Sequence, residues 1–186
     1  MIRESKGNMY PGFETWNPIA GECYHKCGYC STHSFLRYPV MKAKYSGPMR
    51  LDYKTLDKNL GKNKTWFVVA QSDLFAIEVK DCWISEVLNH CCKFDNTYLF
   101  QSKNPRRFFE FKDLFPSKTI LCTTIETNRR YKQMGNTPYP VDRSHALFIL
   151  SEFHKQITIE PIMDFDLPDL VNLIKQAKPN SVNIGR

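Results

Sequence analysis

Short runs of β-branched and aromatic residues alternate along this chain with segments of helical periodicity. Six runs predict strands: Glu14–Ile19, Trp66–Ala70, Thr97–Gln101, Thr119–Ile125, Ile157–Ile162 and Ser181–Ile184. Between them, apolar residues recur every three or four positions, most clearly in Asp81–Phe94 and Leu167–Ala177. Because neighbouring parallel strands need a crossover connection, usually a helix, this alternation predicts a parallel sheet.

The number of strand–helix units sets the fold class. Six units are too few for a closed eight-stranded barrel, which takes about 250 residues, and the chain has 186. We therefore predict an α/β fold, a partial (β/α)6 open barrel with parallel strands, formed by a single domain over residues 1–186. Catalytic and ligand-binding residues in such sheets lie at the carboxyl ends of the strands, so the residues directly after each strand are the candidates for function.

Composition and charge narrow the class of protein. Hydrophobic residues make up 42% of the chain and aromatic residues 13%, which favours a packed core over disorder. Residues 1–8 lack the apolar core of a signal peptide, and no stretch approaches the roughly 18 apolar residues of a membrane span. We expect a cytoplasmic protein without a membrane partner. The formal net charge of +7 favours anionic partners such as nucleic acids.

Three of the seven cysteines lie close together after the first predicted strand, in Gly21-Glu-Cys23-Tyr-His-Lys-Cys27-Gly-Tyr-Cys30. A disulfide framework would spread them along the chain, so this C-x3-C-x2-C spacing favours metal binding. Thiolates bind iron–sulfur clusters, and three local cysteines leave one iron of a [4Fe–4S] cubane open to another ligand. The alternatives are a structural zinc site completed by His25 or His33, and buried cysteines without a metal.

The cysteine spacing, together with the aromatic Tyr29 before the third cysteine, resembles the signature of the radical S-adenosylmethionine (SAM) superfamily. The preceding Thr15-Trp-Asn-Pro-Ile-Ala-Gly21 resembles the opening of a phage-associated radical SAM family of unknown function, which is distantly similar to spore photoproduct lyase. The resemblance implies that Cys23, Cys27 and Cys30 hold a [4Fe–4S] cluster whose open iron binds SAM, with Tyr29 beside the cofactor. It implies reductive cleavage of SAM, hydrogen abstraction from a substrate, and an electron donor such as flavodoxin or ferredoxin.

The same resemblance implies cofactor contacts at the ends of later strands. Where the family often has a Gly-Gly-Glu turn that binds the SAM amino group, this chain has Gln71-Ser72-Asp73, and Ser72 and Asp73 offer acceptors to an ammonium. Glu126 follows the fourth strand, where the family contacts the SAM ribose or methionine end. Lys103 follows the third and is expected to meet the SAM carboxylate or a substrate phosphate. The alternatives are that Ser72 and Asp73 form a surface turn, that Glu126 is an acid at the start of a helix, and that Lys103 is solvated.

Two pairs of arginines also follow predicted strands, and we call these four residues the basic mouth: Arg106, Arg107, Arg129 and Arg130. Asn104-Pro105 and Asn128 precede them and predict helix starts. Cations oppose the dipole of a first helical turn, so we interpret the mouth as a binding site for a nucleic acid or phosphorylated substrate. A solvated rim is the alternative. For the whole chain, the alternative to an enzyme is a zinc-stabilised basic module that binds nucleic acid without catalysis.

Overall fold

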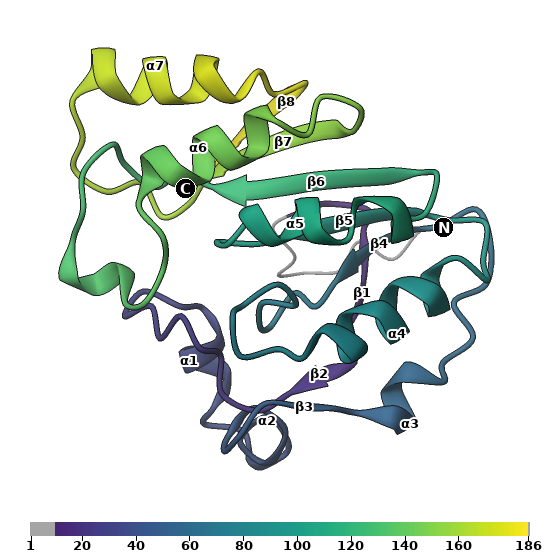
Figure 1. The fold of residues 1–186 in the computed structure, drawn as a ribbon. Helices are drawn as coiled ribbons and strands as arrows, with labels where there is room; N and C mark the ends of the chain where they lie inside the picture. The colour runs from purple at the N-terminus through teal and green to yellow at the C-terminus, as the bar shows by residue number, and fades with distance from the viewer. Residues whose placement is uncertain (1–9, 186) are drawn as a thin grey trace.

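The computed structural model describes residues 10–185; the predicted absence of a signal peptide concerns residues 1–8, which lie outside this range. Its main feature is a six-stranded sheet in the order β1-β4-β5-β6-β7-β8, in which every neighbouring pair is parallel (Figure 1). The strands are β1 Glu14–Trp16, β4 Thr65–Val68, β5 Thr97–Gln101, β6 Thr119–Thr124, β7 His154–Ile159 and β8 Ser181–Ile184. The sheet ends at β1 and β8 without closing, so the predicted partial (β/α)6 open barrel is confirmed.

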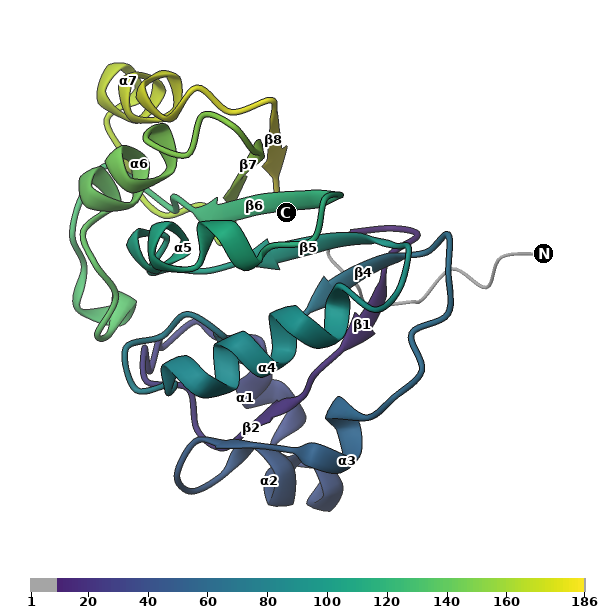
Figure 2. The same ribbon diagram turned by 45° about the vertical axis from the view of Figure 1, so that its right-hand side comes forward.

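Four helices connect successive strands and cover one face of the sheet (Figures 1 and 2): α4 Asp81–Cys91, α5 Arg106–Glu110, α6 Pro140–Phe148 and α7 Leu167–Ala177. The helical period read from the sequence is correct in α4, where Ile84, Val87 and Leu88 are fully buried. Burying each such side chain contributes about 1.5–3 kcal/mol. The main core therefore lies between the sheet and these helices.

The first predicted strand is divided in the structure. β1 stops at Trp16, and β2 (Ile19–Ala20) pairs antiparallel with β3 (Arg50–Leu51) in a separate sheet. Pro18 lies between the two pieces and has no N–H to donate to a ladder, which accounts for the break. Three short helices belong to this region: α1 Thr32–Phe35 and α2 Pro39–Tyr45 lie between β2 and β3, and α3 Tyr53–Leu56 follows β3.

The helix predicted to start at Asn128 is wrong. Residues 128–131 are not helical; a short 3-10 turn, η2 (Lys132–Met134), follows, and α6 begins only at Pro140. The Asn128 side chain donates to Asp166 Oδ2 at 3.1 Å and accepts from the Asp166 N–H at 2.8 Å, so it joins two loops. At the first arginine pair, α5 begins at Arg106 near the predicted helix start, but its N-cap residue is Pro105 rather than Asn104.

Other element bounds shift by a few residues. The predicted strand Ile157–Ile162 is displaced, because β7 begins at His154 and ends before Pro161. The predicted helix Asp81–Phe94 ends at Cys91, and a second 3-10 turn, η1, covers Lys112–Leu114. No helix within residues 10–185 is both long and apolar enough to cross a membrane.

Candidate active site at the carboxyl ends of the strands

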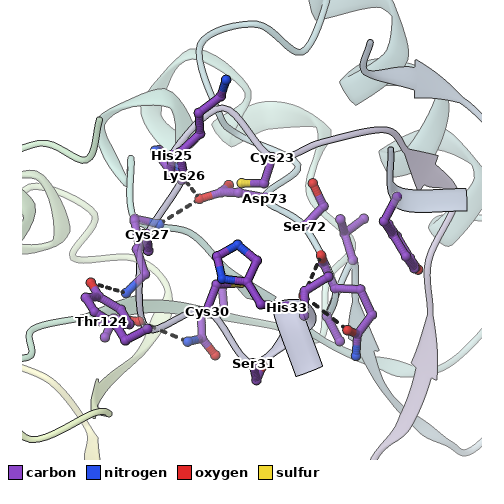
Figure 3. A pocket seen from close by; sticks show the side chains of 18 of the residues that line it. Cys23, His25, Lys26, Cys27, Cys30, Ser31, His33, Ser72, Asp73 and Thr124 are labelled. Atoms are coloured by element: carbon purple, nitrogen blue, oxygen red, sulfur yellow. Dashed lines mark hydrogen bonds and ion pairs between the residues drawn. The ribbon is translucent and has the colours of Figure 1, made fainter. Parts of the chain in front are cut away.

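A cavity of about 530 Å³ lies at the carboxyl ends of the strands (Figure 3). Its volume is within the range of small-molecule sites. The cysteine loop (residues 21–30) and α1 form one wall, and residues that end or follow β4, β5, β6 and β7 form the other. The lining includes Cys23, Cys27, Cys30, Ser72, Lys103 and Glu160.

The start of the cysteine loop is held against the last turn of α2 and the residues that follow it. The Gly21 N–H donates to Lys44 O and the Glu22 N–H to Gly47 O, both at 2.8 Å. Gly21 has a φ of +95°, and a Cβ at this position would lie 2.3 Å from Pro48 O. Only glycine therefore fits here, because it tolerates this φ and adds no side chain.

The rest of the loop packs on residues 131–137, which we call the supporting turn. Gly28 N–H donates to Gln133 O at 2.8 Å, and Asn136 N–H donates to His25 O at 2.7 Å. Gly135 has a φ of +60°, and a Cβ there would lie 2.0 Å from His25 O. The cysteine loop thus takes its shape from backbone hydrogen bonds on two sides.

Cys23, Cys27 and Cys30 all line the cavity, and the Cys27 thiol donates to Met134 O at 3.6 Å. Burial, helped by the Asp73 carboxylate, raises the pKa of Cys23 to about 12, and burial also raises the pKa of Cys27. Binding of a metal to these thiols would therefore displace protons. In a cubane each cysteine binds a different iron, so the donors stand farther apart than the ligands of one ion.

A zinc site needs four donors around one ion, with sulfur at about 2.3 Å. Within residues 10–185, no three His, Cys, Asp or Glu side chains are grouped closely enough to hold a single metal ion. His25 Nε2 is instead 2.8 Å from Asp73 Oδ2, and His33 is exposed. The zinc alternative therefore has no arranged ligand set in this part of the chain.

Asp73 is a buried hub that joins the cysteine loop to the end of β5. Its Oδ2 is 2.8 Å from His25 Nε2 and accepts the Ser102 hydroxyl at 3.0 Å and the Lys103 N–H at 2.8 Å. Its Oδ1 accepts the Phe75 N–H at 2.9 Å. Burial opposes ionisation, but these contacts lower the Asp73 pKa below its usual value. The carboxylate predicted to meet the SAM amino group thus already has four protein partners.

Glu126 is a second buried hub, with none of its side chain exposed. Its Oε1 accepts the Tyr29 hydroxyl at 2.5 Å and pairs with Lys103 Nζ, and its Oε2 accepts from Arg143 at 2.8 Å. Burial opposes ionisation, but the charges of Lys103 and Arg143 hold the pKa of Glu126 at about 2. Glu126 therefore connects Tyr29 on the cysteine loop with Lys103, whose ammonium lies 5.0 Å from the Tyr29 ring.

Ser72 differs from these carboxylates. Its hydroxyl is buried and, among the described residues, it has no hydrogen-bond partner. Ser72 lines the cavity, and Figure 3 shows it next to Asp73. A buried hydroxyl without a partner is unfavourable by about 1–3 kcal/mol, so a ligand that bonded it would gain from it.

No known protein-family model matches the sequence, and no curated protein matches it. Solved structures match it over most of its length. A mutant spore photoproduct lyase with bound AdoMet and dinucleoside spore photoproduct superposes with a TM-score of 0.62 at 13% identity, covering 92% of this chain and 56% of that one. This chain has the fold of spore photoproduct lyase.

A second structure, spore photoproduct lyase complexed with dinucleoside spore photoproduct, gives a TM-score of 0.58 at 15% identity. The match covers 88% of this chain and 49% of that one. The chain thus spans about half the length of the spore photoproduct lyase chains it matches. At these identities the likeness concerns the fold.

The four arginines of the basic mouth are not equivalent in this fold. Arg107 is buried and donates to the carbonyls of Ala76, at 2.5 Å, and Val79, at 3.0 Å, and it also pairs with Asp81. Arg106 is exposed. The structure therefore separates the two neighbours, and Arg107 stabilises the loop between β4 and α4.

The second pair of arginines holds loops together. Arg129 pairs with Asp164 and Asp166 on the loop after β7. Arg130 donates to Thr137 Oγ1 at 2.8 Å and to Gly135 O at 2.5 Å, both in the supporting turn. Phosphate binding by the mouth remains a prediction, and it applies best to Arg106.

From its place before Pro161, Glu160 is expected to point into the barrel, with no role assigned; sequence reasoning missed Gln101 and Thr124 on the two neighbouring strands. Gln101 ends β5, Thr124 ends β6 and Glu160 follows β7, and all three line the cavity. Gln101 Nε2 donates to Thr124 Oγ1 at 3.0 Å. The available signal was their position at or near the carboxyl end of a predicted strand, where side chains of parallel strands meet at one edge of the sheet.

Proposed function

We propose that this protein is a radical SAM enzyme that acts on a substrate derived from nucleic acid. Its [4Fe–4S] cluster would be held by Cys23, Cys27 and Cys30. The observation that carries the proposal is that three cysteines of one loop line a cavity at the carboxyl ends of a partial parallel barrel. The fold of spore photoproduct lyase, which has been solved with AdoMet and a dinucleoside photoproduct, supports it.

The residues present fit such a group. Three sulfur donors suit an iron–sulfur cluster with one open iron, and the unpartnered Ser72 hydroxyl gives a bound cofactor a polar contact. When bound, the cluster and SAM would supply one-electron cleavage of SAM and a radical that abstracts hydrogen from the substrate. We expect the electron to come from a small carrier such as flavodoxin or ferredoxin.

The protein's own groups would orient the reactants. Lys103 lines the cavity with 19% of its side chain exposed, so its ammonium can bind the SAM carboxylate while Glu126 fixes its position. Asp73 and Glu126 would act through their neighbours, by holding His25, Lys103 and Tyr29 in place.

Gln101, Thr124 and Glu160 would face the substrate. An amide, a hydroxyl and a carboxylate together offer donors and acceptors to the edge of a nucleobase. Gly185 gives Glu160 room, because a Cβ at residue 185 would lie 2.6 Å from the Glu160 Oε2 atom. This wall suits a base better than a phosphate, since Glu160 would repel an anion.

Anaerobic purification and reconstitution test the proposal. We expect a brown protein that contains iron and sulfide and, when reduced, converts SAM to methionine and 5′-deoxyadenosine, measured by chromatography. Changing Cys23, Cys27 or Cys30 singly to Ala should abolish both the cluster and SAM cleavage, because each thiolate holds one iron.

The matched control is Cys91→Ala on α4. Cys91 is fully buried in the main core, away from the cavity lining. This variant should keep the cluster and lose only about 1 kcal/mol of unfolding free energy. A full cluster in any one of the three loop variants, or a colourless protein with stoichiometric zinc, would refute the proposal.

A further inference from the structure

The net positive charge of this protein is concentrated in one stretch of the chain. Residues 31–64, which we call the basic segment, contain eight lysines and arginines and two aspartates, so they carry +6 of the total of +7. The remaining residues are almost neutral. A charge asymmetry of this kind is typical of a surface that binds a polyanion.

Most cations of the basic segment have no acidic partner in the described part of the chain. Lys44 pairs with Asp52 at 3.0 Å and Lys64 with Glu14 at 2.8 Å. The other six, Arg37, Lys42, Arg50, Lys54, Lys58 and Lys62, are exposed and form no ion pair within residues 10–185. Their charge is therefore available to an outside partner, unlike that of Arg107 and Arg129.

The basic segment adjoins the cavity. Ser31, Thr32, His33, Leu36 and Tyr45 belong to it and line the cavity wall. Figures 1 and 2 show its helices α1, α2 and α3 grouped together with β2 and β3, beyond the β1 end of the sheet. A chain that inserted one unit into the cavity could continue over this group.

We propose that the basic segment is a docking surface for the sugar–phosphate backbone of a single-stranded polynucleotide, one nucleotide of which enters the cavity. The inference rests on the proposed function and extends it from a nucleoside to a polymer. Three of the six exposed cations, Arg37, Lys42 and Lys54, would bind phosphates. Arg50 would add positive charge, while its guanidinium donates to the carbonyls of Ala43 and Lys44.

Exposed aromatic rings favour a nucleic acid over an anionic membrane or an acidic peptide. Tyr38 is 48% exposed, and the Arg37 guanidinium lies 4.9 Å from its ring centroid. Tyr53 is 58% exposed on α3. Aromatic faces beside cations bind unstacked bases of single strands, whereas duplexes keep their bases stacked.

Two triple variants with the same change in net charge test the inference. The first is Arg37→Gln, Lys42→Gln, Lys54→Gln; the matched control is Lys93→Gln, Lys112→Gln, Lys175→Gln, whose lysines are exposed and lie outside both the segment and the cavity lining. Binding of a fluorescent single-stranded DNA oligonucleotide to the reconstituted protein is measured against salt concentration. The first variant should bind at least tenfold more weakly, and its log–log salt slope should fall by about 2, at about 0.7 for each lost contact.

The control variant should keep most of the affinity and the slope, and both variants should cleave SAM at the wild-type rate. A dinucleotide, too short to cover the segment, should bind all three proteins equally. Tyr38→Ala should weaken oligonucleotide binding about tenfold.

Equal losses in the two triple variants, or no oligonucleotide binding by the wild-type protein, would overturn the inference. So would equally tight, segment-dependent binding to phosphatidylserine vesicles. Absence of SAM cleavage by the wild-type protein would instead count against the proposed function. Failure of the docking inference and failure of the proposed function are therefore distinguishable.

Discussion

Single buried carboxylates organise the candidate site. Asp73 and Glu126 are both buried, and each has several donors from different elements. A buried charge is tolerated only when it is compensated in this way. Sequence position alone cannot separate such a hub from a ligand contact, because both place a carboxylate just after a strand.

The pH dependence of stability should show the Glu126 hub. The Glu126 pKa is about 2 in the folded protein against 4.5 for the free group. Its contribution, on the order of 3 kcal/mol, is therefore present above pH 4.5 and lost as the pH falls towards about 2. Urea unfolding between pH 6 and pH 2 should show this fall in the wild-type protein and a smaller one in Glu126→Gln.

A second variant covers the case in which Glu126→Gln does not fold. Lys103→Met removes the cation that contributes most to lowering the Glu126 pKa. The folded-state pKa should therefore rise, and the loss of stability on acidification should be smaller and end at a higher pH than in the wild type. Identical pH profiles for wild type and both variants would contradict the role given to Glu126.

The neighbouring arginines Arg106 and Arg107 offer a matched pair. Arg107→Gln should lower the free energy of unfolding by about 2–3 kcal/mol, because the buried carbonyls of Ala76 and Val79 lose their donor. Arg106→Gln should change it by less than about 0.5 kcal/mol, as surface substitutions do. Thermal and urea unfolding measure both, and equal effects would be inconsistent with the buried contacts of Arg107.

At the level of elements, sequence periodicity predicted the main strands and the longer helices. The six parallel strands and the buried faces of α4 and α7 follow from runs of β-branched residues and helical spacing. The β2–β3 pair was not predictable, since two-residue strands carry no period. Nor was the supporting turn, because its role depends on contacts between residues about 107 positions apart, such as Cys27 and Met134.

Gly135 gives that turn a direct test. Gly135→Ala should displace the cysteine loop, because the new Cβ would meet His25 O at 2.0 Å, and cluster content after reconstitution should fall by at least half. Gly12→Ala is the control: Gly12 also has a positive φ, of +83°, but no atom lies within 4 Å of the position that its new Cβ would take. Both variants carry backbone strain of about 1 kcal/mol, so only the Gly135 variant should lose iron.

For the whole molecule, the sequence indicates the charge and its distribution along the chain, but not which cations are paired within the fold. The basic mouth was chosen because its arginines follow strands, yet three of its four members bind within the protein. The net charge lies instead in residues 31–64, a region of short elements that periodicity did not resolve.

Removal of iron should leave the fold intact. The cysteine loop is held by backbone hydrogen bonds from Gly21, Glu22, Gly28 and Asn136, none of which involves a thiol. We expect the far-ultraviolet circular dichroism and the urea midpoint of chelator-treated protein to match those of the reconstituted protein closely. A cooperative loss of structure on chelation, as in zinc fingers, would contradict this.

A cysteine loop held by backbone hydrogen bonds rather than by the proposed cluster has a consequence for oxidative damage. If the proposed cluster were destroyed by oxidation, these backbone hydrogen bonds would keep the cysteine loop folded, and a new cluster could be assembled without unfolding of the chain. The rate of cluster reassembly would then depend on the concentrations of iron and sulfide rather than on refolding. The hydrogen bonds from Gly28 and Asn136 would then allow one polypeptide to bind several clusters in succession.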